Sequence, residues 1–183
     1  NPGLTGAVQN QPDFQAGAAD HRTHFVSSVP ALVRQAMDEY STLTGRHYAP
    51  VHTYLCDDAE TVMVGLGSVC DDVEAVVTHL RARGEKVGLV SVKLLQPFPE
   101  AELVAALAGK RAVTVLERSD QTALTQLVSS ALFKARENGE AGHARHAGIP
   151  AIQAIPTLTT AIFGLGGHDL QPRTDQRGGL LRA

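Results

Sequence analysis

The feature that most constrains this chain is an alternation, starting at Thr61, between short apolar runs and segments with one apolar face. The run from Thr61 to Leu66 is almost continuously apolar, as expected of a strand whose two faces are both covered. After it, apolar residues recur at steps of three and four up to Gly84, which predicts a helix with one buried side. The same pair of patterns then repeats along the chain.

The repeats predict three more strands, over residues 86–94, 111–117 and 156–163, and two more helices, over 99–108 and 124–139. Strands that alternate with helices pair in parallel through right-handed crossovers. The sequence therefore predicts an α/β fold over residues 51–173, with an open parallel sheet of about four to five strands and flanking helices. The carboxyl ends of these strands share one edge, where ligands or partner domains usually dock.

The first fifty residues lack this alternation. Residues 9–13 read as a loop, and a helix is predicted from Ala31 to Leu43, capped by Ser28, with one apolar face buried and a stop at Gly45. We therefore expect residues 1–50 to be a linker arm with one docking helix and residues 174–183 to be a polar tail. The irregular ends and the missing initiator Met suggest a segment cut from a longer polypeptide.

Composition excludes several classes of function. A net charge of -3, 4% aromatic residues and no Trp argue against nucleic acid as a partner. Two cysteines, Cys56 and Cys70, are too few for an iron–sulfur cluster, and the histidine pairs 21/24 and 143/146 lack further metal ligands. No apolar run reaches bilayer length and no signal peptide opens the chain, so we expect no metal, no membrane and a cytoplasmic location.

The turn after the first strand, Gly65-Leu-Gly67-Ser68-Val-Cys70, partly resembles a dinucleotide-binding loop. Cys70 stands where that loop needs a third glycine, and the following strand ends without the acidic residue that binds ribose. We interpret the segment as a tight turn in which Ser68 or Asp71 caps a helix. Gly67 and Ser68 stay as weak candidates for holding an anion that a partner domain brings.

Two other polar segments lie near strand ends. Glu117 and Arg118 could line a site or form a salt-bridged rim, and the Gly-rich segment 164–169, with His168 and Asp169, favours a turn or a domain contact. The sequence contains no Walker loop, no H-E-x-x-H motif and no Gly-Asp-Gly segment of the thiamine-diphosphate type. We therefore predict that this chain holds no catalytic residues of its own.

Several segments resemble a known family. The turn at Gly67, the Pro-Phe-Pro that follows the second strand at residues 97–99, and the Leu-Glu-Arg at 116–118 are similar to a transketolase C-terminal-type domain. The segment from Ala7 to Ala16 is similar to the linker that leaves the thiamine-binding domain of pyruvate:ferredoxin oxidoreductases. Residues 163–172 are similar to the segment that closes their second domain.

This resemblance implies a structural and interdomain module, domain II, of a 2-oxoacid:ferredoxin or flavodoxin oxidoreductase. The whole enzyme would use thiamine diphosphate, Mg²⁺, iron–sulfur clusters and coenzyme A, all held by other domains, and would form a homodimer that passes electrons to ferredoxin or flavodoxin. The chain departs from the family at residues 5–10, at Ala16-Gly-Ala-Ala19 and at Gln96. The expected contacts with other domains of the polypeptide are made by Pro97, Phe98, Glu117, Arg118, Gly164, Gly166, Gly167, His168 and Asp169.

Two other readings stay open on the residues alone. A small-molecule-binding regulatory domain could use the edge at Gly67 and Ser68. A C-terminal domain of a transketolase-like or oxoacid dehydrogenase subunit would share the α/β core but not the N-terminal arm or the Phe-Gly-Leu-Gly-Gly ending at 163–167.

Overall fold

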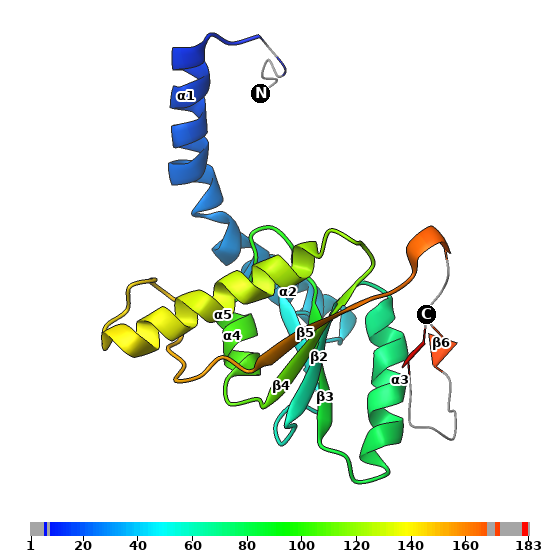
Figure 1. The fold of residues 1–183 in the computed structure, drawn as a ribbon. Coiled ribbons are helices and arrows are strands. Elements are labelled where there is room, and N and C mark those ends of the chain that lie inside the picture. The colour runs from blue at the N-terminus through cyan, green and yellow to red at the C-terminus, as the bar shows by residue number, and fades with distance from the viewer. Residues whose placement is uncertain (1–5, 7, 168–170, 173–180, 183) are drawn as a thin grey trace. The chain divides into compact units, whose positions relative to one another are not determined.

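The computed structural model describes residues 6, 8–167, 171–172 and 181–182, and the chain divides into two compact units, residues 1–49 and 50–183. The first unit contains helix α1 (Gln11–Asp20), a π-helix (His21–Val26) and helix α2 (Val29–Thr44). The second contains a five-stranded sheet with helices on both faces (Figure 1). Among the helices of these described residues, none is both long and apolar enough to cross a membrane.

The expected loop over residues 9–13 is wrong, because α1 already begins at Gln11. The side chain of Asn10 accepts a hydrogen bond from the backbone N–H of Asp13 (3.0 Å), and Pro12 lies in the first helical turn. Asn and Pro at these positions are helix-starting residues as well as turn residues. The segment Asn-Gln-Pro-Asp is therefore a helix N-cap that was misread as a loop.

The predicted helix from Ala31 to Leu43 is present within α2, which is two residues longer at its start and ends at Gly45 as expected. Two details differ. Ser28 occupies the N-cap position, but its side chain makes no capping hydrogen bond. None of the residues of α2 is buried, although its apolar residues were expected to form a buried face, because the helices of this unit do not enclose a core.

The sheet has the strand order β1-β3-β2-β4-β5. Strands β2 (Thr61–Leu66), β3 (Val87–Val92), β4 (Ala112–Glu117) and β5 (Thr157–Ile162) are mutually parallel, which confirms the predicted α/β fold. The edge strand β1 (Val51–Tyr54) was missed and pairs antiparallel with β3. Four residues carry too little periodicity for a strand to stand out.

Helix α3 (Val69–Arg81) covers one face of the sheet, and α4 (Glu100–Leu107) and α5 (Ala123–Ala141) cover the other (Figure 1). The larger core lies under α4 and α5 and includes Val62, Val64, Leu103, Leu107, Val113, Val115, Val128 and Leu132. The smaller core lies under α3 and includes Cys70, Val73, Val77, Leu89 and Leu116. A short 3-10 turn (Leu165–Gly167) follows β5, and strands β6 (Gln171–Pro172) and β7 (Leu181–Arg182) pair with each other.

Helix α5 continues past Gly139, where the sequence predicted its end. Gly139 permits a close approach of the following loop, because a Cβ at this position would lie 2.1 Å from the carbonyl oxygen of Ile152. The adjacent Asn138 is buried, and its amide donates to the carbonyls of His146 (3.0 Å) and Ile149 (2.8 Å) and accepts from the N–H of His146 (2.8 Å). The loop that follows the helix is therefore fastened to it by hydrogen bonds between the Asn138 side chain and the loop backbone.

The loop between β1 and β2 is held by Arg81, in the last turn of α3. Its guanidinium forms a bidentate pair with Asp58 (2.6 and 2.8 Å) and also donates to the carbonyls of Leu55 (2.5 Å) and Val87 (2.7 Å). The hydrogen bonds and charge of Arg81 hold the pKa of Asp58 below its usual value. One side chain thus ties β3, α3 and the β1–β2 loop together.

We expect Gly139→Ala to lower the free energy of unfolding by about 1–3 kcal/mol, because the added methyl group must displace the backbone at Ile152. Thermal or urea unfolding measures the loss. Gly17→Ala in α1 is the control, since nothing lies within 4 Å of its new Cβ, and it should only increase helix content by circular dichroism. Equal or greater stability of Gly139→Ala would contradict the close approach.

The Asp58–Arg81 pair should make stability depend on acid pH. Because folding lowers the pKa of Asp58, the pair stabilises the fold fully above the pKa of an unfolded Asp, about 3.9, and this contribution is lost as the pH falls through the folded value. The difference in unfolding free energy between the wild type and Asp58→Asn should be constant from about pH 5 to pH 7 and shrink below about pH 4. Urea unfolding at each pH measures the difference, and Asp57→Asn, which removes the neighbouring exposed carboxylate and leaves the Asp58–Arg81 pair intact, is the matched control.

Candidate functional site

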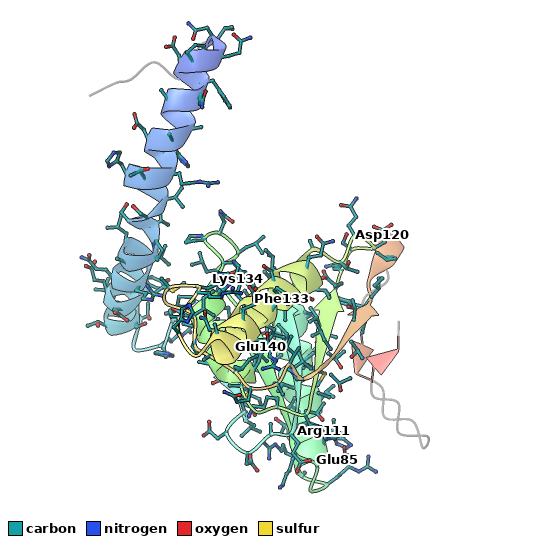
Figure 2. The ribbon with its side chains drawn as sticks, turned by 60° about the vertical axis from the view of Figure 1, so that its left-hand side comes forward. Glu85, Arg111, Asp120, Phe133, Lys134 and Glu140 are labelled. Atoms are coloured by element: carbon teal, nitrogen blue, oxygen red, sulfur yellow. The ribbon has the colours of Figure 1, made fainter. Side chains whose placement is uncertain are left out.

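A cavity of about 340 Å³ opens at the carboxyl edge of the sheet. Asp120, at the start of the connection from β4 to α5, marks this end of the unit, and Arg111, before β4, marks the opposite end (Figure 2). The cavity is lined by the last residues of β2 and β4, by residues that follow β2, β3, β4 and β5, and by the starts of α3 and α5: Leu66, Gly67, Ser68, Val69, Leu95, Leu116, Glu117, Arg118, Ala123, Leu124 and Phe163.

The position of this cavity follows from the strand order. The chain leaves β2 through α3 toward β3 on one side, and it leaves β4 through α5 toward β5 on the other side. Right-handed crossovers in opposite directions place α3 and α5 on opposite faces of the sheet. The connections after the neighbouring strands β2 and β4 therefore diverge, and the cavity lies at this topological switch point.

The first wall is the turn at Gly67 and Ser68. The N–H groups of Cys70 and Asp71 donate to the carbonyls of Gly67 (3.2 Å) and Ser68 (3.1 Å), and the Ser68 side chain makes no capping hydrogen bond. The expected side-chain cap by Ser68 is therefore wrong, because the turn itself engages these N–H groups. Ser68 is exposed at the cavity, where its hydroxyl is one of few polar groups.

Gly65 takes over the packing role that the missing third glycine would have had. A Cβ at Gly65 would lie 3.1 Å from the sulfur of Cys70, so β2 and α3 approach closely at this pair. Burial raises the pKa of the Cys70 thiol, and burial likewise raises that of Cys56. Both thiols are therefore protonated at neutral pH, which makes them poor nucleophiles and poor metal ligands.

Glu117, the last residue of β4, is only 5% exposed, and its carboxylate caps α5. Its Oε1 accepts a hydrogen bond from the backbone N–H of Thr125 (2.6 Å), in the first turn of that helix. A carboxylate at a helix N-terminus interacts favourably with the free N–H groups and with the helix dipole. The neighbouring Arg118 is exposed and also lines the cavity.

The remaining predicted contact residues are spread over several places. Phe98 packs against the core beneath α4, so Leu95 rather than Pro97 or Phe98 reaches the cavity from this connection. Gly164 is buried directly after Phe163, and Gly166 and Gly167 lie in the exposed 3-10 turn. His168 and Asp169 lie outside the described residues.

Sequence reasoning found the polar members of this cavity and missed the apolar ones, chiefly Leu95, Leu116 and Phe163. A signal was available, since each of the three lies at or just after the end of a strand. The walls are mainly apolar, the one buried carboxylate is engaged by α5, and no group of three metal-binding side chains occurs among the described residues. The arrangement can hold an apolar group beside a guanidinium, but it offers no acid–base pair.

Residues 59–148 match the family described as pyruvate:ferredoxin oxidoreductase core domain II. The chain is similar to pyruvate synthase subunit PorA of Methanothermobacter thermautotrophicus, with 33% identity over 161 residues that cover 88% of this chain and 38% of the relative. It is also similar to the probable pyruvate-flavodoxin oxidoreductase of Escherichia coli K12, with 32% identity over 178 residues that cover 94% of this chain and 14% of the relative.

A solved structure shares the fold. It is 2-oxoglutarate:ferredoxin oxidoreductase from Magnetococcus marinus with 2-oxoglutarate, coenzyme A and succinyl-CoA bound, with a TM-score of 0.51 and 22% identity over 89% of this chain and 23% of that chain. The chain spans well under half the length of each of these proteins. Through residues 59–148, this chain belongs to the pyruvate:ferredoxin oxidoreductase family as its core domain II.

Proposed function

We propose that residues 1–183 are the structural and interdomain module of an enzyme that oxidatively decarboxylates a 2-oxoacid such as pyruvate to an acyl-CoA and passes the electrons to ferredoxin or flavodoxin. The similarity to a pyruvate synthase subunit and to a pyruvate-flavodoxin oxidoreductase supports this reaction. The whole enzyme is a cytoplasmic homodimer in this proposal. Residues 1–50 are its linker arm and docking helix, 51–173 its α/β domain and 174–183 a tail.

The observation that carries the non-catalytic role is the engagement of Glu117 by α5. It is the carboxylate that faces the cavity, and its hydrogen bond to Thr125 has a structural purpose. Apart from Glu117, the polar side chains that line the cavity are the Ser68 hydroxyl and the Arg118 guanidinium, and the other walls are mainly apolar. Such walls suit an inserted side chain of another domain better than a reacting substrate.

The cofactors of the whole enzyme do not fit the residues of this chain. An iron–sulfur cluster needs about four thiolates, whereas the two cysteines here are buried and their pKa values are raised by that burial. The described residues contain no cluster of three metal-binding side chains for Mg²⁺, and the sequence lacks the thiamine-diphosphate segment. We assign thiamine diphosphate, Mg²⁺, the clusters and coenzyme A to other parts of the polypeptide.

A second candidate function is the binding of a small regulatory ligand in the cavity. The observation in its favour is the location at a topological switch point, where open α/β sheets usually bind ligands. The shortage of polar groups that could orient a ligand makes it the weaker of the two.

The isolated chain, once its fold is verified by circular dichroism, should show no pyruvate-dependent reduction of a viologen dye, and calorimetry should detect no binding of thiamine diphosphate. The reason is that the described residues contain no group of three metal-binding side chains and the sequence contains no thiamine-diphosphate segment. The full-length enzyme is the positive control in both assays. Clear binding of thiamine diphosphate by the folded chain would overturn the non-catalytic assignment.

In the full-length enzyme, Glu117→Ala should destabilise this domain by about 1–3 kcal/mol, because α5 loses a buried, charge-assisted cap. Glu117→Gln keeps an oxygen acceptor and should lose less. Differential scanning calorimetry measures both, while kcat and KM for the 2-oxoacid should stay unchanged below the unfolding temperature. A large loss of kcat with intact stability would instead make Glu117 catalytic.

A further inference from the structure

The outer edge of β5 carries backbone groups that point away from the rest of the sheet. On the inner edge, the N–H of Thr157 donates to the backbone carbonyl of Arg111 (3.1 Å), and the N–H of Phe163 donates to the backbone carbonyl of Glu117 (2.9 Å). Both bonds point toward β4. Backbone groups alternate in direction along a strand, so residues 159 and 161 also face β4 and residues 158, 160 and 162 face outward. Among the described residues of the second unit, no strand pairs with this outer edge.

This edge lacks the devices that usually protect one. The strand Thr157–Ile162 contains no charged residue and no proline, and it is the longest exposed edge of the sheet, since β1 at the opposite side has four residues. Natural edge strands are commonly short, charged, bulged or covered. Strands β6 and β7 do not supply the cover, because they pair with each other and β6 lies against α3, on the other side of the sheet.

An apolar groove of about 460 Å³ lies beside the same strand. It is lined by Ser129, Ser130, Leu132, Phe133, Ile155 and Leu158, and none of these residues is charged. Phe133 is 58% exposed and Ile155 is 42% exposed, although both are large and apolar. Figure 2 shows Phe133 on α5. Because Leu158 belongs to both features, the groove and the free edge form one continuous surface.

The charges near this surface already have partners within the domain. Lys134 of α5 pairs with Glu100 of α4 (2.6 Å), and Arg136 pairs with Glu140 (2.9 Å) within α5. Figure 2 labels Lys134 directly beside Phe133 and Glu140 farther along the same helix. The groove itself is uncharged and these nearby charges on α5 are paired, so it fits an occupant that contributes backbone hydrogen bonds and apolar side chains rather than charge.

We propose that an extended segment of the same polypeptide, from outside residues 1–183, pairs with β5 as a further strand and places an apolar side chain in the groove beside Phe133 and Ile155. The relatives support a covalently linked occupant, because the matched region makes up 38% or 14% of their length, so most of each polypeptide lies outside it. Tethering raises the effective concentration of such a segment, so a surface of modest size suffices. The inference rests on the proposed interdomain role.

Hydrogen exchange tests this proposal in the full-length enzyme, read at single residues by mass spectrometry. If the segment pairs with β5, the amides of 158, 160 and 162 exchange as slowly as those of 159 and 161, which bond to β4 and serve as internal controls. Exchange of the outward-facing amides that is about tenfold or more faster than that of the inward-facing ones overturns the proposal. Protection that disappears on dilution also overturns it, since the occupant is then a second copy.

A pair of variants on α5 tests the groove. Ser130→Lys places a charge in the groove without altering a buried residue, and it should speed exchange at 158, 160 and 162 by about tenfold or more while 159 and 161 stay unchanged. Gln126→Lys, one helical turn earlier, exposed and outside the groove, is the matched control and should have no effect. Equal exchange in both variants rejects the groove as part of the docking surface.

Activity separates the two proposals. If the full-length enzyme does not transfer electrons from pyruvate or another 2-oxoacid, the proposed function fails, whereas the exchange pattern of β5 is read independently of turnover. If the enzyme is active and the outward-facing amides exchange freely, the docking proposal alone fails.

Discussion

The parallel pairing of β2 on both of its edges is the constraint on which the second unit depends. β2 pairs with β3 over six residues and with β4 over four, so the backbone groups in these paired stretches are satisfied without water. Its side chains enter both cores, with Val62 and Val64 fully buried beneath α4 and α5. Because β2 is paired along both edges and covered on both faces, the segments that connect the parallel strands must pass over the faces of the sheet. Helices must cross to both sides of it.

The divergence of those helices decides where the domain can bind something. Because α3 and α5 leave neighbouring strands toward opposite faces, the cavity beside Gly67 and Glu117 is a consequence of strand order and not of any motif. The residue types then decide what the cavity can do. Glu117 is committed to α5, and most of the remaining walls are apolar. In the proposed function, the topology that gives many enzymes an active site forms a contact surface for another domain.

The parts of the fold that were predictable are those that rest on long, repeated periodicity: the four parallel strands and helices α3, α4 and α5. The failures have local physical causes. β1 is too short to show a period, and Asn10 with Pro12 begins a helix as readily as it forms a turn. Gly139 was interpreted as a helix stop. Only the folded structure shows that a glycine is required there because the backbone of Ile152 occupies the space that a side chain would fill.

The cavity was half predictable for a related reason. Chemistry-bearing residues such as Ser68 and Glu117 draw attention in a sequence, whereas Leu95 and Phe163 acquire a role only when strand order brings their loops together. The free edge of β5 was not predictable at all, since a sequence does not say which strand lies outermost. What the strand contains, three threonines and no charge, becomes meaningful only after its position is known. The docking proposal rests on this combination, because an unprotected edge favours a partner that remains close, and a covalently linked segment meets that condition at low cost.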